Sequence, residues 1–386
     1  MKRVLCVIMT KLFVGGGLTT VMLNYYRELW NRPEYAEEYK IDFLSHGNID
    51  EKLYAELRSH GCRYFSMPAR KENPLGHYRT FARIVREGQY DIVHYNCNSG
   101  ADGIELAIAK KYVPVRVCHV HNSSTRHPLL HRLFVNCIRT SYTKAVAVSE
   151  ESGRWLYGDA SDFVVLNNAI NVEKFAYDSA VRKSMRERLG LEDDVIVIGS
   201  VGRMNRGNQK NTGFLIRAFA LTYERCPSAR LLLVGDGELK PRWEALADAL
   251  GVTDVVTFAG FQKNVEEWMQ AFDVFCFPSR WEGLGMVAVE AQAAGLPVLA
   301  SEAVPREVGL TPLVSFLPIG EEDELVWADA ILLRAEEPLS GRDDPAIAQN
   351  LLAGGYDIRH EVEKLVEIYG IDNNGNEEIP ITQIQG

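Results

Sequence analysis

Two glutamates in an otherwise small and apolar stretch are the first residues that could do chemistry. In WEGLGMVAVEAQAAG, Glu282 and Glu290 are separated by seven residues. Because burying an unpaired carboxylate is costly, each is expected to have a partner. The two hydroxyls of a ribose would satisfy Glu290, and Glu282 could hold sugar hydroxyls beside the free N–H groups of a helix that begins near Leu284. The alternative is that Glu290 reaches solvent and Glu282 caps the helix.

Two cations follow the strand-like run that opens the second half of the chain. In VGRMNRGNQKN, Arg203 and Lys210 lie on a polar loop. Together they could clamp a diphosphate and stabilise the negative charge that develops when a bond to it breaks. The alternative for this stretch is a solvated basic loop.

A glycine-rich turn follows the first strand-like run, in FVGGGLTTVMLNYYREL. Glycine allows the backbone to approach a ligand, and the N-terminus of a helix predicted from Thr19 or Thr20 suits a diphosphate. Leu, Thr and Thr follow Gly17, so the G-x-G-x-x-G fingerprint of dinucleotide-binding proteins is not matched. A glycine turn without a ligand is the alternative.

Two histidines alternate where a further strand-like run ends, in VCHVHNSS. His119 and His121 could suggest a metal, but the sequence offers no evident third ligand. The seven cysteines contain no C-x-x-C pair. Their scatter predicts reduced thiols in a cytoplasmic protein and no structural metal site.

Apolar strand-like runs alternate with helical patterns along the first half of the chain. Continuous apolar runs are typical of strands that are covered on both faces of a parallel sheet. Helices are predicted at 20–30 and 78–88. The strands are predicted at 3–8, 40–45, 63–68, 91–96, 115–120, 144–149 and 163–167.

The same alternation restarts in the second half, which predicts an α/β protein with two doubly wound domains. We expect an N-terminal domain at 1–168, a C-terminal domain at 169–357, a helix at 358–370 that packs back on the N-terminal domain, and a polar tail at 371–386. The second set of strands is predicted at 195–203, 229–237, 255–260, 274–279, 296–301 and 313–318.

The charge distribution bears on possible partners. The chain of 386 residues has a net charge of −10, which argues against general nucleic-acid binding. Residues 1–168 hold 22 Lys+Arg and 17 Asp+Glu, or +5, and the remainder holds 20 and 35, or −15. The first half could therefore face an anionic surface, or the asymmetry could be chance plus an acidic tail.

Two basic stretches in the first half could meet such a surface. Arg79, Arg83 and Arg86 share one helix face, and a basic and apolar segment spans 126–144. Together they suit an anionic lipid-linked acceptor, or they are ordinary amphipathic helices with solvated arginines. No apolar run approaches the length of a membrane span, and the start MKRVLCVIM is interpreted as a strand rather than a signal peptide.

The two glutamates also carry a family resemblance. Glu282 and Glu290 reproduce the Glu-x7-Glu signature of retaining, GT-B-fold glycosyltransferases of family 4, and FPSRWEGLGMVAVEAQAAGLPVLAS resembles that family along its length. LLLVGDG, VAVSEESGRWLYG and VVLNNAINVEKF are similar too, and HVHN with MLNYYRELW resembles the bacterial exopolysaccharide and capsule branch. The resemblance spans roughly residues 3–370. It implies the GT-B architecture, two Rossmann-like domains facing across a cleft.

The resemblance assigns roles in the second domain. Arg203 and Lys210 would contact the donor diphosphate, and Glu282 would contact the donor sugar. Glu290 would hold the ribose hydroxyls. The backbone N–H groups of a short turn would bind the donor as well: Gly283, Leu284, Gly285 and Met286.

In the first domain, the resemblance places Gly16 and Gly17 near the donor diphosphate and His121 near the donor sugar. The family usually has an acidic residue where this chain has Thr19. The interval from Arg203 to Lys210 is about two residues longer than usual, so Arg206 is a possible substitute for Lys210.

The implied activity is a retaining, metal-independent hexosyl transfer from a nucleotide-diphosphate sugar, a UDP-sugar before a GDP-sugar. The acceptor would be a polysaccharide or a lipid-linked saccharide bound by the N-terminal domain. No tightly bound cofactor is implied, and the expected location is the cytoplasm, with peripheral contact at the inner face of the plasma membrane. Two alternatives remain open: a catalytically idle nucleotide-sugar-binding protein and a nucleotide-dependent oxidoreductase.

Overall fold

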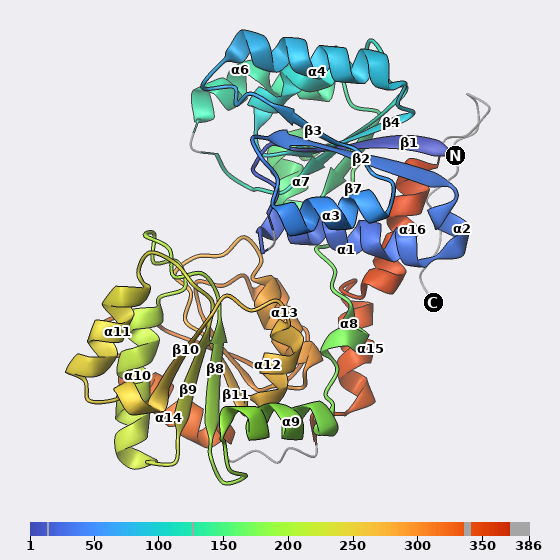
Figure 1. Cartoon of the computed structure of the whole chain (residues 1–386). Helices are drawn as coiled ribbons and strands as arrows, with labels where there is room; N and C mark the ends of the chain where they lie inside the picture. Colours follow the sequence, from blue (N-terminus) through green and yellow to red (C-terminus); the bar gives the residue numbers. More distant parts are fainter. Residues whose placement is uncertain (14, 126, 336–340, 371–386) are drawn as a thin grey trace. The chain divides into compact units, whose positions relative to one another are not determined.

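The computed structural model describes residues 1–13, 15–125, 127–335 and 341–370 (Figure 1). The chain divides into two compact units. Unit 1 is Met1–Ala169 together with the segment that begins at Ile358, and unit 2 is Ile170–Asp357. The polar tail expected at 371–386 lies outside the described residues.

Unit 1 is built on a parallel sheet with the strand order β3-β2-β1-β4-β5-β6-β7. In the centre of the sheet, Val4 of β1 lies opposite Ile41 of β2 and Ile92 of β4. The central strands are buried because helices cover both faces, as their continuous apolar sequences predict. The strands are β1 (Lys2–Ile8), β2 (Tyr39–His46), β3 (Tyr64–Met67), β4 (Ile92–Cys97), β5 (Val115–Val120), β6 (Lys144–Ala147) and β7 (Val164–Val165).

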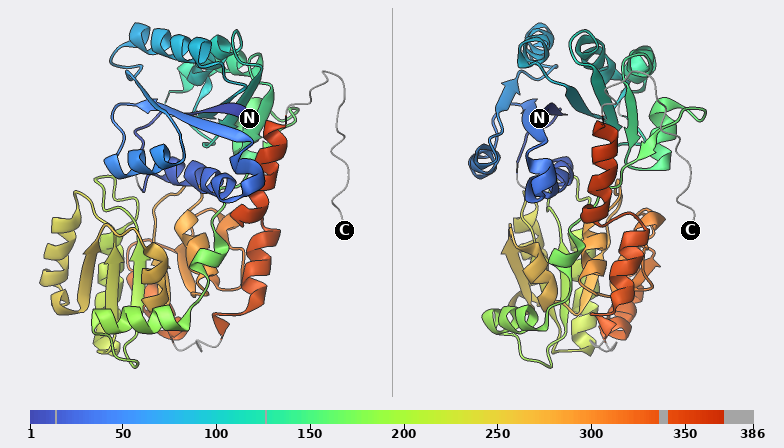
Figure 2. Two further views of the ribbon diagram at one scale, coloured as in Figure 1. Left: turned by 45° about the vertical axis from the view of Figure 1, so that its right-hand side comes forward. Right: turned by 90° about the vertical axis from the view of Figure 1, so that its right-hand side faces the viewer.

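The helices of unit 1 form two layers, and the last helix of the chain belongs to one of them (Figure 2). One face of the sheet carries α1 (Gly17–Asn31), α2 (Pro33–Ala36), α3 (Glu51–Ser59) and α16 (Ile358–Tyr369). The other face carries α4 (Pro74–Gly88), α5 (Gly103–Ala109), α6 (Pro128–Arg139) and α7 (Glu150–Tyr157). The helix α1 begins two residues before the predicted Thr19, because Gly16 takes the N-cap position with an extended backbone.

Unit 2 repeats the plan with a second parallel sheet, of order β10-β9-β8-β11-β12-β13. Its first strand, β8, again lies in the middle and pairs with its second and fourth strands. The predicted α/β class with two doubly wound sheets is therefore confirmed. The strands are β8 (Val197–Val201), β9 (Arg230–Val234), β10 (Val256–Gly260), β11 (Val274–Phe277), β12 (Val298–Ser301) and β13 (Val314–Leu317).

Helices cover both faces of this sheet as well. One layer holds α8 (Val172–Phe175), α9 (Ser179–Leu189), α12 (Val265–Ala271), α13 (Met286–Ala293) and α15 (Pro345–Ala353). The other holds α10 (Thr212–Arg225), α11 (Lys240–Ala249) and α14 (Glu324–Ala335). The helix α13 begins at Met286 rather than at the predicted Leu284, because Gly285 adopts a left-handed backbone with φ +93°.

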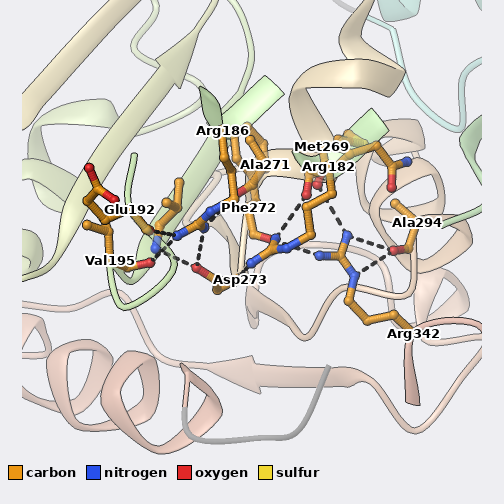
Figure 3. Close-up of polar contacts among 12 residues, drawn as sticks. Arg182, Arg186, Glu192, Val195, Met269, Ala271, Phe272, Asp273, Ala294 and Arg342 are labelled. Carbon is orange, nitrogen blue, oxygen red and sulfur yellow. Dashed lines mark hydrogen bonds and ion pairs between the residues drawn. The ribbon is translucent and has the colours of Figure 1, made fainter. Parts of the chain in front are cut away.

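A cluster of buried arginines ties the helices of unit 2 to the amino-terminal edge of its sheet (Figure 3). Arg182 and Arg186 form ion pairs with the two carboxylate oxygens of Asp273, at 2.5 and 3.3 Å. Arg342 donates to the carbonyls of Ala294 and Phe272. Carbonyls at the end of α12 and just before β8 accept from the same arginines, so partial negative charges help to balance three guanidinium groups.

Candidate active site

The candidate donor site of unit 2 lies where two loops leave the middle of the sheet. The helices that follow β8 and β11 pack on opposite faces, so these adjacent strands mark the switch point at which open α/β sheets bind ligands. The loop after β8 carries Arg203 and Lys210, and the loop after β11 carries Glu282. The backbone N–H of Arg280 donates to the carbonyl of Gln209 at 2.8 Å, which joins the two loops.

An ion pair between Lys210 and Glu282 is the central contact of this site. The Lys210 Nζ lies 2.7 Å from Glu282 Oε1 and 4.5 Å from the centroid of the Phe277 ring. The Glu282 side chain is 8% exposed, and its second oxygen accepts from Gln209 Nε2 at 3.2 Å. The sequence therefore brings a cation and an anion together from two loops across the switch point.

The choice between Lys210 and Arg206 was open in the sequence. In the structure Lys210 points at Glu282, whereas Arg206 is exposed at the turn of the loop. Asn208 and Asn211 adopt left-handed backbone conformations, with φ of +48° and +53°. Asparagine tolerates this conformation, so the longer loop folds back before α10 and presents Lys210. Arg203 is exposed on the same loop.

Glu290 lies on α13, and its carboxylate is largely desolvated. Within the described residues its carboxylate has no hydrogen bond or ion pair, although a partial opening to solvent remains. Desolvation raises the pKa of Glu290 to about 7, against an opposing effect of Lys210. A desolvated carboxylate without donors is a ready acceptor for hydroxyl groups.

The turn before α13 leaves room beside these carboxylates. A Cβ atom added to Gly283 would meet nothing within 4 Å, so space is open there. At Gly285 the backbone is left-handed, and a Cβ would come within 2.9 Å of the Phe277 ring. Leu284 and Met286 are half-buried on either side, and no side chain caps α13. The N–H groups of its first turn can therefore face a ligand.

In unit 1, the candidate glycines form the start of α1. Gly16 is the N-cap and Gly17 the first helical residue, and no side chain caps this helix either. A Cβ at Gly17 would meet nothing within 4 Å, whereas one at Gly16 would press on Thr19 and Phe13. The N-terminus of α1 thus follows β1, at the switch point between β1 and β4.

His121 follows β5 in the same unit, next to a row of buried polar side chains. Its Nε2 lies 2.8 Å from Asn96 Oδ1, and its ring centroid is 4.1 Å from that of His119. Burial lowers the pKa of His121 to about 3, so the imidazole is neutral at physiological pH. Asn96 and His94 were not predicted as site residues, although polar residues in the buried strand IVHYNC were a signal for them.

The described residues contain no group of three or more His, Cys, Asp or Glu side chains suited to a metal ion. In the same part of the chain, no helix has the length and apolar character needed to cross a bilayer.

Comparisons with known proteins identify the family of the chain. Two family descriptions match the chain: Glycosyl transferases group 1 at residues 195–334 and Glycosyltransferase Family 4 at residues 15–174. EpsF of Bacillus subtilis (strain 168), named as a glycosyltransferase, is 33% identical over 371 residues, which cover 92% of this chain and 94% of EpsF. Alpha-monoglucosyldiacylglycerol synthase of Acholeplasma laidlawii is 28% identical and covers 57% of this chain and 61% of its own.

Among solved structures, Anabaena HepE in complex with UDP and glucose superposes with a TM-score of 0.73. It is 20% identical and covers 96% of this chain and 99% of its own. Two parallel α/β units with polar loops at the carboxyl ends of their strands place the chain in the GT-B class. The chain belongs to the family 4 (group 1) glycosyltransferases, and it is a glycosyltransferase.

Proposed function

We propose that the enzyme transfers a hexose from a UDP-sugar to a polysaccharide or lipid-linked saccharide acceptor, with retention of anomeric configuration and without a metal ion or bound cofactor. The observation that carries the proposal is the Lys210–Glu282 pair at the switch point of unit 2, next to the desolvated Glu290. Glu290 would accept the two ribose hydroxyls, and Lys210 with Arg203 would contact the diphosphate. The solved complex of HepE with UDP and glucose supports the choice of nucleotide.

The proposed chemistry depends on charge stabilisation and positioning. An acceptor oxygen forms its bond to the anomeric carbon on the face from which the phosphate leaves, and the leaving phosphate oxygen takes the acceptor's proton. Lys210, Arg203 and the N-terminus of α13 stabilise the charge that develops on the diphosphate. In unit 1, Gly16 and Gly17 at the start of α1 would contact the donor diphosphate, and His121 would contact the donor sugar.

The first test is a thermal-shift and calorimetric titration with UDP, GDP, ADP and NAD in EDTA, on wild type and Glu290→Ala. A ligand at about a hundred times its Kd adds about 2.7 kcal/mol of stability. We expect UDP alone to stabilise the wild type, and the effect to be lost in Glu290→Ala. Absence of a response to any nucleoside diphosphate would contradict the donor site, and a response that needs Mg²⁺ would contradict metal independence.

Turnover then separates an enzyme that uses this donor from an idle binding protein of the same fold. We expect slow release of UDP from UDP-glucose, with the anomeric configuration of the freed sugar read by NMR before mutarotation. An α-anomer from the α-linked donor supports retention, and a β-anomer contradicts it.

The acceptor side of the proposal is a membrane surface, and α6 supplies the apolar part. Leu129, Leu130 and Leu133 are 83%, 47% and 68% exposed, and Ile138 is the buried residue of this helix. The helix packs through its backbone: a Cβ on Gly100 would lie 2.3 Å from the carbonyl oxygen of His131. Close backbone packing leaves the leucines facing solvent, on a helix whose sequence, PLLHRLFVNCIR, lacks acidic residues.

The helix α4 supplies the charge. Arg79, Arg83 and Arg86 are exposed, while Phe81 and Val85 are buried, as the sequence pattern predicts. Both α4 and α6 pack against α5, so they belong to one layer of unit 1. Apolar side chains beside cations suit the inner leaflet of the plasma membrane, where each arginine contributes about 1 kcal/mol. The enzyme would then work in the cytoplasm on a lipid-linked acceptor.

Flotation with vesicles of phosphatidylcholine and phosphatidylglycerol tests this surface. We expect the wild type to float at low salt and Leu129→Ser/Leu133→Ser to remain at the bottom. Leu333→Ser is the matched control, because Leu333 is 67% exposed on α14 of unit 2. Equal flotation of the double variant and wild type, or a loss in the control, would contradict the assignment to α6.

A further inference from the structure

Asn96 is fully buried in β4, and its surroundings determine the orientation of its amide. Its Nδ2 lies 3.0 Å from the carbonyl oxygen of Val7 and 3.6 Å from the Cys6 sulfur. A backbone carbonyl can only accept, so the amide end that faces Val7 must be the NH₂ group. The Asn96 Oδ1 therefore points the other way, toward His121.

The orientation of Asn96 in turn determines the tautomer of His121. Its Nε2 lies 2.8 Å from Asn96 Oδ1, which can only accept. The proton of the neutral imidazole must then be on Nε2, and Nδ1 carries a bare lone pair. Within the described residues Nδ1 has no hydrogen bond, and it keeps some exposure to solvent. A ligand can therefore reach it.

The titratable groups around His121 carry no positive charge. His94 Nε2 lies 3.0 Å from His119 Nδ1, and His94 Nδ1 lies 2.7 Å from the hydroxyl of Tyr369. Burial lowers the pKa of His94 to about 3 and that of His119 well below its usual range. Burial raises the pKa of the Cys6 thiol to about 12. All of these neighbours are neutral at physiological pH.

We propose that Asn96 is a positioning residue that locks His121 in its Nε2–H tautomer, so that Nδ1 meets the donor sugar solely as a hydrogen-bond acceptor. The contact between Nδ1 and the donor sugar rests on the proposed function, whereas the tautomer itself does not. The group that reaches His121 must then bring its own hydrogen, as a sugar hydroxyl does. A sugar carboxylate or a deoxy carbon at that position would leave Nδ1 unpaired and be rejected.

Nitrogen NMR of the whole chain, labelled at histidine, tests the tautomer without any ligand. Long-range ¹H–¹⁵N correlations distinguish the protonated from the bare ring nitrogen, and His121→Gln identifies the signals of His121. We expect the Nε2–H pattern in the wild type, unchanged between pH 5 and pH 8. An Nδ1–H pattern, or an imidazolium in this range, would overturn the proposal even if the enzyme turns over UDP-glucose.

A pH profile tests the positioning role. In Asn96→Asp a carboxylate would still accept from Nε2, but it would raise the pKa of His121 by about 1–3. Protonation would then block Nδ1 in weak acid. We expect UDP-glucose turnover by Asn96→Asp to fall about tenfold more than that of the wild type between pH 8 and pH 5.

The matched control is Asn136→Asp on α6, which makes the same change on an exposed residue of unit 1. Its profile should follow the wild type. If Asn96→Asp also follows the wild type, the positioning role is wrong. If the wild type itself fails to turn over UDP-glucose, the proposed function fails, and the NMR result still decides the tautomer.

Discussion

The two units share one contact: an aspartate just before the fourth strand of the sheet accepts from a backbone N–H of the first strand. The surroundings of the two aspartates differ. In unit 1, Asp91 precedes β4 and accepts from the backbone N–H of Arg3 at 2.7 Å. In unit 2, Asp273 precedes β11 and accepts from the backbone N–H of Val197, also at 2.7 Å. Each aspartate N–H donates back to the carbonyl of the same residue. Only Asp273, however, also carries two buried arginines.

The carboxyl ends of the strands diverge as well. Within β4 and β5 and just after β5, unit 1 gathers neutral imidazoles whose pKa values burial lowers. Beyond β8 and β11, unit 2 places a lysine and two carboxylates. A shared strand order thus determines where a site lies, while the loop residues determine whether it presents dipoles or charges.

The largest effect is expected when the aspartate before the fourth strand of each sheet is replaced. Asp273→Asn leaves Arg182 and Arg186 without their carboxylate and should destabilise unit 2 by about 3–5 kcal/mol. Asp91→Asn removes a single charged acceptor and should cost unit 1 about 1.5–3 kcal/mol. Hydrogen exchange of the full chain measures each unit separately. Equal costs would mean that the arginine cluster does not depend on Asp273.

The next effect concerns charge in the candidate site of unit 2. Lys210→Met removes a cation that would stabilise the negative charge developing on the diphosphate. It should lower kcat by about 10²–10³-fold. Lys240→Met is the matched control, since Lys240 pairs with Glu244 on the surface of α11. UDP release from UDP-glucose is the measurement. An unchanged kcat in Lys210→Met, with a loss in Arg206→Met, would transfer the role to Arg206.

A change of pH should change the stability of the two units in opposite directions. The folded-state pKa of Glu290 is raised from 4.5 to about 7, so the stability of unit 2 falls as pH rises through this window. The folded-state pKa of His121 is lowered from 6.5 to about 3, so the stability of unit 1 falls as pH drops through this window. Glu290→Gln should therefore stabilise unit 2 by about 1–3 kcal/mol at pH 8 and not at pH 4.

Hydrogen exchange at pH 4, 6 and 8 on wild type and Glu290→Gln measures both trends. The same pH trend for unit 2 in the wild type and in Glu290→Gln would show that Glu290 has an ordinary pKa in the folded protein.

The smallest effect concerns the exposed leucines. Leu133→Ser on α6 should change the stability of unit 1 by less than about 0.5 kcal/mol, because the side chain is 68% exposed. Ile138→Ser on the same helix should cost several times more, since Ile138 is fully buried. Urea unfolding compares the two. A large cost for Leu133→Ser would indicate that the residue is buried in solution.

The elements of the fold could be predicted because their signals are local. Every predicted strand is present, since each is a short apolar run between turn residues, as in LLLVG before Asp236. The starts of α1 and α13 were misplaced by about two residues, because the backbone of a glycine decides whether it caps or joins a helix.

The site was partly predictable for the same reason. Glu282 and Lys210 were singled out from their own loops, but their 2.7 Å contact joins residues far apart in sequence. The role of Asn96 depends on Val7 and His121, which lie on two other segments, so no local pattern contains it. The arginine cluster likewise combines α9, β11 and Arg342.

The division of the chain has a consequence for its synthesis. Unit 2 is continuous, whereas unit 1 needs the last helix, whose Tyr369 bonds to His94 and Tyr26. A ribosome adding about 5–20 residues per second needs about 10–40 s to pass from Ala169 to Tyr369. During that time the nascent sheet of unit 1 lacks the cover of α16, while unit 2 is synthesised as far as Asp357. The N-terminal unit therefore starts first and matures last.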